Sequence, residues 1–296
     1  MLLDGVRNWF ARKALPARVR RVAAASAWVA DIPPPAHERP GAIWPAARIG
    51  LAEQLWGDGF VSPGGEEEVL NLARPFGLTA AASLLLLGAG PGGPPRVISD
   101  EFDAWVSGYE SDPELRDLAL ERVRRGELGK RVQVAGWNQA VPKFRARFFH
   151  HCLALEPLRG ADPAPVLAAL AAALKRGGQL ALVELVADAP LDPTDPNVAA
   201  WAGLERRPPV LPSEVAISVH LAGLGFDIRV VEDISRRHTV QALIGWRAAV
   251  QEMHGQKRPP PAHAALVVAE AELWFRRLDL IRAGKLRLLR WHAIAG

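Results

Sequence analysis

A glycine-rich turn directly after an apolar run is the feature of this 296-residue sequence with the clearest chemical meaning. The run ends at Leu87, and residues 88–92 read Gly-Ala-Gly-Pro-Gly. Glycines there let a ligand approach the backbone, and a helix that starts at the turn offers free N–H groups. Glu110 ends the next apolar run, 20 residues after Gly90, where a carboxylate can bind the two hydroxyls of a ribose. The pair predicts a nucleoside-binding turn, with a purely structural turn and a helix-capping acid as the alternative.

The elements that must position this turn alternate between two patterns from about residue 43 onward. Apolar runs of strand length occur at Ser83–Leu87, Ala104–Tyr109, Arg131–Ala135, Arg145–His150, Gln179–Leu185, Phe226–Val231 and Leu286–Ala293. Apolar residues at helical steps occur at Glu66–Arg74, Pro113–Arg125, Pro165–Lys175, Ser213–Leu224, 236–253 and 262–283. Such alternation predicts an α/β fold with a parallel sheet and crossover helices.

The composition excludes several classes of protein. Hydrophobic residues make up 49% of the chain and charged residues 23%, which is ordinary for a globular fold and unlike a disordered chain. Cys152 is the single cysteine, which excludes an internal disulfide framework and a multi-cysteine zinc site, and no metal site is expected. Neither a membrane-spanning segment nor a signal peptide is expected, so a cytoplasmic location is the default expectation.

The net charge of +4 is unevenly distributed along the chain. Residues 1–21 contain six basic residues and one acid, Asp4, so they carry +5 and the remainder carries −1. Trp9 and Phe10 give this segment an apolar side. A basic amphipathic arm suits an anionic membrane surface or an acidic protein partner, whereas a surface helix packed on the body is the structural alternative. Nucleic acid is not expected as a partner, because the body has no basic excess.

Three segments together resemble the class I S-adenosylmethionine-dependent methyltransferases. Beside the glycine-rich turn with its acid, residues 174–180 (LKRGGQL) are similar to the Leu-Lys-Pro-Gly-Gly turn before the fifth strand of that family. Residues 56–68 (WGDGFVSPGGEEE), hereafter the covering segment, resemble a segment that folds over the cofactor in phosphoethanolamine N-methyltransferases and related small-molecule methyltransferases. The resemblance covers about residues 44–250. It implies a Rossmann-like sheet of seven strands in the order 3-2-1-4-5-7-6, with helices on both faces and the last strand antiparallel.

The resemblance also implies S-adenosylmethionine as cofactor and a set of residues that would contact it. These are Ser62, Gly88, Ala89, Gly90, Gly92, Glu110, Ser111, Trp137, Asn138 and His150. Glu110 would accept hydrogen bonds from the ribose hydroxyls. Trp137 and Asn138 would lie beside the adenine, and His150 would lie near the amino-acid end of the cofactor.

The reaction that the resemblance implies is methyl transfer (EC 2.1.1.-) to a small molecule or a lipid headgroup. Transfer from a sulfonium is an in-line displacement, and a general base is needed only when the nucleophile arrives protonated. The candidates for such a group are Glu184 and His151, the latter with a structural role as its alternative. Helices of residues 232–285 would cover the substrate side, where Trp246 and Trp274 form either an aromatic enclosure or an ordinary core.

Departures from the family pattern leave other functions open. Leu86 and Arg145 stand where the family has acids, and Trp44 and Leu155 stand where phosphoethanolamine enzymes have Tyr and His. Phosphoethanolamine is therefore not inferred as the substrate of this chain. The alternative function is a binding or assembly protein that has the methyltransferase fold but no catalytic activity. The glycine-rich turn alone also permits a nicotinamide-dependent enzyme.

Three parts of the chain are expected from the changes in pattern. Residues 1–42 form the basic arm, residues 43–231 together with 286–296 form the core, and residues 232–285 form a helical cap.

Overall fold

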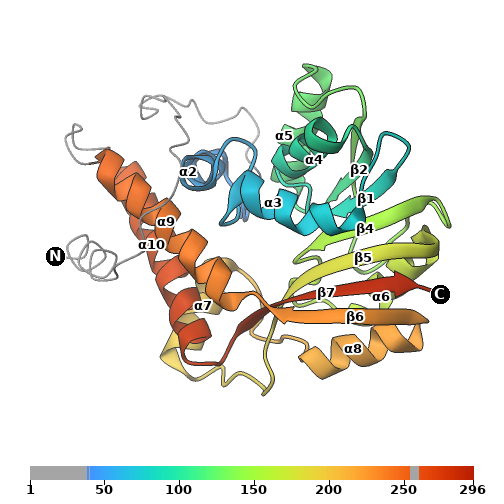
Figure 1. Ribbon diagram of the computed structural model, residues 1–296. Coiled ribbons are helices and arrows are strands. Elements are labelled where there is room, and N and C mark those ends of the chain that lie inside the picture. Colours follow the sequence, from blue (N-terminus) through green and yellow to red (C-terminus); the bar gives the residue numbers. More distant parts are fainter. Residues whose placement is uncertain (1–38, 40, 254–259) are drawn as a thin grey trace.

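Seven strands form one sheet at the centre of the structure (Figure 1). The computed structural model describes residues 39, 41–253 and 260–296. The strands are β1 (Ser83–Leu87), β2 (Trp105–Glu110), β3 (Val132–Gly136), β4 (Phe149–Leu155), β5 (Leu174–Val186), β6 (Phe226–Asp233) and β7 (Arg287–Ala295). Their order is β3-β2-β1-β4-β5-β7-β6, with parallel pairs from β3 to β5 and with β7 antiparallel to both of its neighbours. The predicted sheet is confirmed.

Helices cover both faces of the sheet and also pack beyond one of its ends (Figure 1). They are α2 (Ala46–Trp56), α3 (Gly65–Ala73), η1 (Arg74–Phe76), α4 (Gly93–Phe102), α5 (Pro113–Arg124), α6 (Pro163–Ala173), α7 (Pro196–Glu205), α8 (Glu214–Gly223), α9 (Ser235–Met253) and α10 (Pro261–Arg282). Helices α2, α7, α9 and α10 contact one another and form the helical group beyond the sheet. No helix in the described ranges has the length and hydropathy needed to cross a bilayer.

The central strand β1 is apolar on both of its faces, as a parallel strand between two helical layers must be. Leu84 and Leu86 belong to the hydrophobic core on one face of the sheet, and Leu85 and Leu87 belong to the core on the other. All four side chains are fully buried. This burial fixes the end of β1 firmly, and the glycine-rich turn begins at that end.

Side-chain caps begin several of the helices. Asp112 accepts hydrogen bonds from the N–H groups of the first turn of α5, and Ser213 accepts one from the first turn of α8. Asp195 caps α7 in the same way. Helix α7 is not among the helices predicted from the sequence, although an Asp-Pro step such as Asp195–Pro196 is a recognised signal for a helix start.

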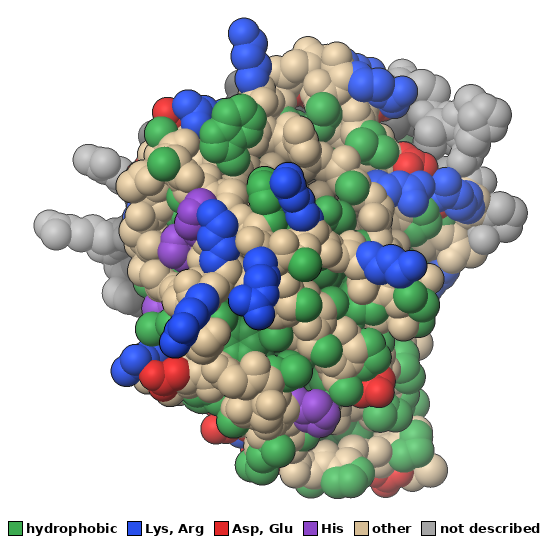
Figure 2. All heavy atoms as spheres, turned by 90° about the vertical axis from the view of Figure 1, so that its right-hand side faces the viewer, with side chains coloured by type: hydrophobic (Ala, Val, Ile, Leu, Met, Phe, Trp, Pro, Cys, Tyr) green, Lys and Arg blue, Asp and Glu red, His purple; other side chains and the backbone are tan. Residues whose placement is uncertain are grey.

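The strand predicted at Arg145–His150 is wrong by about four residues, because β4 spans Phe149–Leu155. The exposed residues 145–147 precede β4, and Arg147 has a positive φ of 47° that a strand would not accept. The pairing of His151 with Leu84 of β1 sets the register, so that the histidines lie at the amino end of β4. Figure 2 shows the face of the molecule on this side, where Lys and Arg side chains outnumber acidic ones.

Candidate functional site

The glycine-rich turn is held in place by the end of the neighbouring strand β2. The N–H groups of Gly88 and Ala89 donate to the carbonyl oxygen of Tyr109 (3.0 and 3.3 Å), and the Gly90 N–H donates to Oε2 of Glu110 (2.8 Å). Gly92 then caps α4 with a left-handed φ of 110°. The structure therefore brings Gly88, Ala89, Gly90, Gly92 and Glu110 together, as predicted from the sequence.

The carboxylate of Glu110 is the charged group at this turn. The residue is 6% exposed, and burial raises its pKa above the ordinary value against the effect of the N–H groups of Asp112, Gly90 and Ser111. Gly90 donates to Oε2 and Asp112 to Oε1 (2.9 Å). A carboxylate oxygen has two lone-pair sites, so each oxygen keeps one with which to accept a ligand hydroxyl.

The covering segment crosses directly over this turn. The Gly93 N–H donates to the carbonyl oxygen of Gly59 (3.0 Å). Oε1 of Glu53 accepts hydrogen bonds from the Gly59 N–H (3.0 Å) and from Nη2 of Arg122 (2.9 Å). Nη1 of Arg122 in turn donates to the carbonyl oxygen of Pro91 (3.2 Å). A backbone hydrogen bond and a partly buried ion pair thus fix the covering segment to the turn.

Replacement of Gly93 with alanine is expected to lower the free energy of unfolding by about 1–3 kcal/mol. A Cβ atom at this position would lie 2.5 Å from the carbonyl oxygen of Gly59 and 2.6 Å from its carbon, so the covering segment would have to move. Urea denaturation of both proteins measures the change. Gly223→Ala is the matched control, since a Cβ at this helical glycine meets nothing within 4 Å. Equal stability of the two variants would contradict the tight packing described here.

A cleft of about 630 Å³ lies on the β2–β3 side of the turn. Its lining includes Ser111, Trp137 and Asn138, three of the residues predicted to bind the cofactor. The Trp137 ring packs against Phe144 (5.8 Å between centroids), and its buried Nε1 has no hydrogen-bond partner in the described part of the chain. Oδ1 of Asn138 accepts a hydrogen bond from the Ala140 N–H (2.9 Å). The volume of the cleft is sufficient for an aromatic base.

A smaller cavity, of about 60 Å³, lies on the β4 side of the turn. Ser62 of the covering segment lines it together with Leu155, Glu156 and His238. Leu155 also borders the turn, because a Cβ on Gly88 would lie 2.8 Å from its carbonyl oxygen. Predicted cofactor residues line both hollows, whereas the glycine-rich turn and Glu110 line neither of them.

The predicted aromatic enclosure is not present at either hollow. Trp201, Trp246 and Trp274 are buried in the core around the helical group, and none of them lines the cleft or the smaller cavity. Trp274 packs edge-on against Trp56 (5.2 Å between centroids) and against His238 (5.7 Å). These residues form an ordinary helix-packing core.

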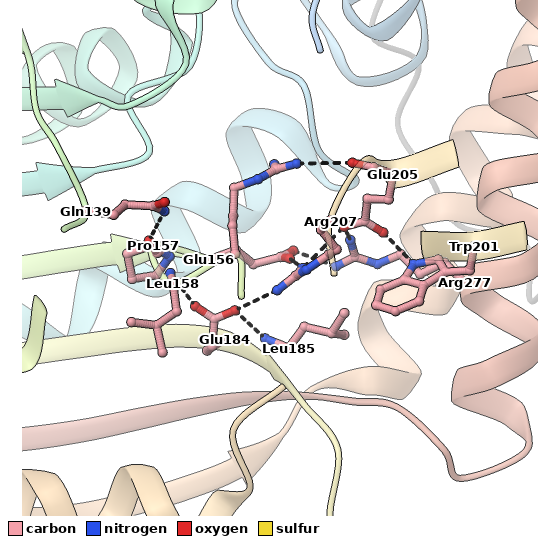
Figure 3. Close-up of polar contacts among 11 residues, drawn as sticks. Gln139, Glu156, Pro157, Leu158, Glu184, Leu185, Trp201, Glu205, Arg207 and Arg277 are labelled. Carbon is pink, nitrogen blue, oxygen red and sulfur yellow. Dashed lines mark hydrogen bonds and ion pairs between the residues drawn. The ribbon is translucent and has the colours of Figure 1, made fainter. Parts of the chain in front are cut away.

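Four buried charged residues and the partly buried Glu156 meet at the carboxyl ends of β4 and β5 (Figure 3). This buried ion cluster consists of Glu156, Glu184, Glu205, Arg207 and Arg277. Nη2 of Arg277 donates to Glu156 (2.5 Å), and its Nη1 donates to Glu205 (3.1 Å). Arg207 lies within 3.2–3.5 Å of all three carboxylates. The sequence gives no signal for this cluster, because its members come from segments far apart in the chain.

Glu184, predicted as a catalytic residue, belongs to the cluster rather than to a cavity wall. Its oxygens accept hydrogen bonds from the N–H groups of Leu158 (2.9 Å) and Leu185 (3.1 Å), and the side chain is fully buried. Burial raises the pKa of Glu184 to about 7. Burial acts on Glu156 in the same direction, but Arg277 and Arg207 outweigh it and hold the pKa of Glu156 at about 2.

The raised pKa of Glu184 predicts that stability falls as the pH rises. The folded chain keeps a proton on this carboxyl that the unfolded chain releases near its ordinary pKa of 4.5. The contribution of this proton to the free energy of unfolding is therefore complete below pH 4.5 and is lost as the pH rises through about 7. The difference corresponds to about 3 kcal/mol. In the Glu184→Gln variant, the free energy of unfolding should change less between pH 5 and pH 8 than it does in the unaltered protein. Urea denaturation of both proteins at each pH measures this difference. Parallel pH profiles for the two proteins would exclude this assignment.

The two histidines of β4 lie far from the turn, and this placement corrects the predictions made for them. Nδ1 of His150 accepts a hydrogen bond from the Ser83 N–H (3.0 Å) at the amino end of β1, and its Nε2 lies 2.8 Å from Nζ of Lys175. The ring of His151 stacks on Phe76 (5.1 Å). Neither residue lines the cleft or the smaller cavity. The predictions assumed that the strand ends at His150, whereas it begins there.

Comparisons with known proteins agree with this architecture. No protein-family profile matches the chain. Over 134 residues the chain is 29% identical to phosphoethanolamine N-methyltransferase 2 of Caenorhabditis elegans, which covers 45% of this chain and 30% of that protein. Phosphoethanolamine N-methyltransferase 2 of Haemonchus contortus, solved with S-adenosyl-L-methionine, has a TM-score of 0.72 and 23% identity over 83% of this chain and 56% of that one.

A putative sarcosine dimethylglycine methyltransferase of Galdieria sulphuraria has a TM-score of 0.68 and 14% identity, over 84% of this chain and 98% of that one. The chain thus matches this protein over almost its whole length, but it spans only about half of the nematode structure. The order of the sheet and these similarities identify the fold as that of the class I S-adenosylmethionine-dependent methyltransferases, and within that fold the chain resembles the phosphoethanolamine N-methyltransferases.

Proposed function

We propose that the chain is an S-adenosylmethionine-dependent methyltransferase that acts on a small molecule or a lipid headgroup. The observation that carries this proposal is the buried carboxylate of Glu110, which accepts a hydrogen bond from the Gly90 N–H of the glycine-rich turn. A carboxylate at such a turn suits a nucleoside, whose ribose would lie at the carboxylate.

The residues around the turn fit S-adenosylmethionine. The free lone pairs of Glu110 would accept hydrogen bonds from the ribose hydroxyls. Trp137 would lie against the adenine in the cleft, and Asn138 and Ser111 would lie next to it. Ser62 would contact the other end from the covering segment.

When bound, the cofactor supplies a methyl group on a positively charged sulfur. The protein has two tasks in such a reaction. It must hold the nucleophile in line with this methyl group, and it must keep water out of the pocket, and together these can lower the barrier by several kcal/mol. The fixed covering segment and the small volume beside Leu155 serve both tasks.

Isothermal titration calorimetry of the full chain tests this proposal. S-adenosylmethionine and S-adenosylhomocysteine should both bind with micromolar affinity, whereas a reduced nicotinamide dinucleotide should not bind. Incubation with methyl-labelled cofactor and a panel of small amines should then give a labelled product. If neither S-adenosylmethionine nor S-adenosylhomocysteine binds at millimolar concentration, the proposed methyltransferase function is excluded, and neither hollow is a cofactor site.

A methyltransferase-fold binding or assembly protein without catalysis is the second candidate. The buried ion cluster favours it, because these side chains fill the carboxyl ends of β4 and β5 and leave only about 60 Å³ beside the turn. Cofactor binding without transfer to any acceptor of the panel would support this candidate over the enzyme.

We also propose that the basic arm of residues 1–21, which lies outside the described residues, attaches the protein to an anionic membrane surface. The proposed division of the chain has three parts, which are the arm (1–42), the core (43–231 with 286–296) and the cap (232–285). Sedimentation with vesicles that contain phosphatidylserine should depend on this arm. Unchanged sedimentation of a protein that lacks residues 1–30 would exclude the membrane and leave an acidic protein as the partner.

A further inference from the structure

His150 and Lys175 bring two hydrogen-bond donors together at the amino edge of the sheet. Nζ of Lys175 lies 2.8 Å from Nε2 of His150. The backbone N–H of Ser83, which can only donate, bonds to Nδ1 of the same ring (3.0 Å). Because Nδ1 accepts this hydrogen bond, the imidazole carries its proton on Nε2. An ammonium group has no lone pair to accept that proton, so the contact between the two side chains lacks an acceptor.

The charge state of the ring agrees with this assignment. Burial, and then the positive charge of Lys175, lower the pKa of His150 below its ordinary value of 6.5. The ring is therefore uncharged at pH 7, and the ammonium group of Lys175 is left without a negative partner beside it. An anion next to Nε2 and Nζ would accept hydrogen bonds from both donors and compensate the positive charge.

The segments that carry these two residues contain no acidic residue. Residues 139–155 and 163–183 have five Lys and Arg residues and neither Asp nor Glu. The five are Lys143, Arg145, Arg147, Lys175 and Arg176. None of them forms an ion pair in the part of the chain that the structure describes. Positive charge thus gathers here without compensation from the protein itself.

Backbone hydrogen bonds hold the two segments side by side. The N–H groups of Arg147 and Phe148 donate to the carbonyl oxygens of residues 172 and 173 (2.9 and 3.0 Å), just before Lys175. The guanidinium group of Arg145 lies over the Phe148 ring, 3.9 Å from its centroid. Figure 2 shows this side of the molecule, where blue side chains outnumber red ones. The cations of both segments therefore belong to one surface.

This surface is remote from the glycine-rich turn. His150 contacts Ser83, the first residue of β1, whereas the turn follows Leu87, the last residue of that strand. Five residues of a strand, at about 3.3 Å each, separate the two ends by about 16 Å. The five basic residues and His150 line neither the cleft nor the smaller cavity. A ligand at this edge would therefore leave the proposed cofactor site free.

We propose that His150, Lys175 and the neighbouring arginines bind a phosphate group at the amino edge of the sheet. A phosphate group has three acceptor oxygens and a charge of about −1.5 to −2 at pH 7. It can accept hydrogen bonds from Nε2 and Nζ and also compensate nearby guanidinium groups, which the single charge of a carboxylate does less well. The phosphate belongs to a free small molecule or to a lipid headgroup, which share this chemistry. The site does not depend on the proposed methyltransferase function.

Isothermal titration calorimetry of the full chain, at pH 7.5 and constant ionic strength, tests the proposal. Glycerol 3-phosphate, a soluble phosphate ester, should bind at least tenfold more tightly than acetate. Lys175→Met keeps the aliphatic stem and should weaken this binding at least tenfold, whereas Lys175→Arg should recover part of the loss. His150→Phe removes the Nε2 donor and should also weaken it. Lys130→Met is the matched control, because Lys130 is exposed just before β3, at the same edge of the sheet, and its loss should change the affinity less than twofold.

Sedimentation with phosphatidylcholine vesicles that contain phosphatidic acid distinguishes the two sources of phosphate. Binding of the soluble ester that depends on Lys175, without such a dependence in sedimentation, assigns the site to a free phosphate. Sedimentation that depends on Lys175, without binding of the soluble ester, assigns it to a lipid headgroup, and dependence in both measurements supports the site for either source.

Three results would overturn the proposal. They are acetate binding as tight as phosphate binding, equal losses in Lys175→Met and Lys130→Met, and no dependence on Lys175 in either measurement. Circular dichroism checks that Lys175→Met folds. If it does not fold, Arg176→Met, at an exposed residue, provides the same test, with an expected loss of about threefold and the same control.

Discussion

Replacement of Arg277 with methionine is expected to lower the free energy of unfolding by about 3–5 kcal/mol. The guanidinium group is almost completely buried and donates to Glu156 and Glu205 at 2.5 and 3.1 Å. Methionine fills much of the same volume but leaves two carboxylates in the interior with Arg207 as their remaining cation. An uncompensated buried charge costs far more than a lost contact on the surface. Urea denaturation followed by circular dichroism measures the effect.

Arg282→Met is the matched control for this prediction, on the same helix. Arg282 is also paired with a carboxylate, Asp279, but its side chain is 69% exposed. Solvent screens such a pair, so its loss should cost less than about 1 kcal/mol. The double variant Arg277→Met/Glu156→Gln should regain part of the stability, because it removes one of the unpaired charges. A loss below 1 kcal/mol in Arg277→Met would show that the buried ion cluster does not contribute to folding as described.

Replacement of Glu110 with alanine is expected to weaken the binding of S-adenosylmethionine about a hundredfold. Two hydrogen bonds from ribose hydroxyls to a carboxylate would be lost, at about 1.5–3 kcal/mol each, and part of the loss is recovered by water. The variant also leaves the N–H of Gly90 without its present acceptor, which loosens the turn itself. Glu110→Gln keeps one acceptor oxygen and should lose only about tenfold. Calorimetry at pH 7.5 provides both numbers.

The control for this prediction is Glu127→Ala, since Glu127 is an exposed acid in the turn after α5. Its affinity for S-adenosylmethionine should equal that of the unaltered chain. If Glu110→Ala binds as tightly as Glu127→Ala, the buried carboxylate has a purely structural role at the turn. The alternative that the sequence leaves open for Glu110 would then be the correct one.

Most of the sheet could be predicted from the sequence, because its signals are local. The run Ser83–Leu87 has four consecutive leucines and ends at a glycine, and the structure has β1 at the same residues. Asp112 and Ser213 are caps whose partners lie two or three residues away. In β4 the local signal misled, because the apolar residues around Phe148 and Phe149 lie only at the start of the strand, which continues to Leu155. Because of this shift, His150 and His151 were expected at the carboxyl end of the strand, whereas they lie at its amino end.

The candidate site was predictable in part, for the same reason. The glycine-rich turn, Glu110 and Ser111 lie within one strand–turn–helix–strand unit, where sequence spacing fixes spatial distance. The buried ion cluster and His238 depend on how α7, α9 and α10 return to the sheet, and spacing along the chain does not determine that. One signal for His238 was present, since it shares steps of four with the buried Ala242 and Trp246. A polar residue on an otherwise apolar helical face marks a place where the interior needs a hydrogen bond.

The buried ion cluster also limits how this sequence can change over evolutionary time. Glu156 after β4, Glu205 of α7, Arg277 of α10 and Arg207 of the loop after α7 compensate one another, so a single neutral substitution among these four leaves a charge without its counterpart. Substitutions at these four positions should therefore be correlated among descendants of a common ancestor. A lineage would either inherit the whole constellation or replace it collectively with apolar side chains of similar volume.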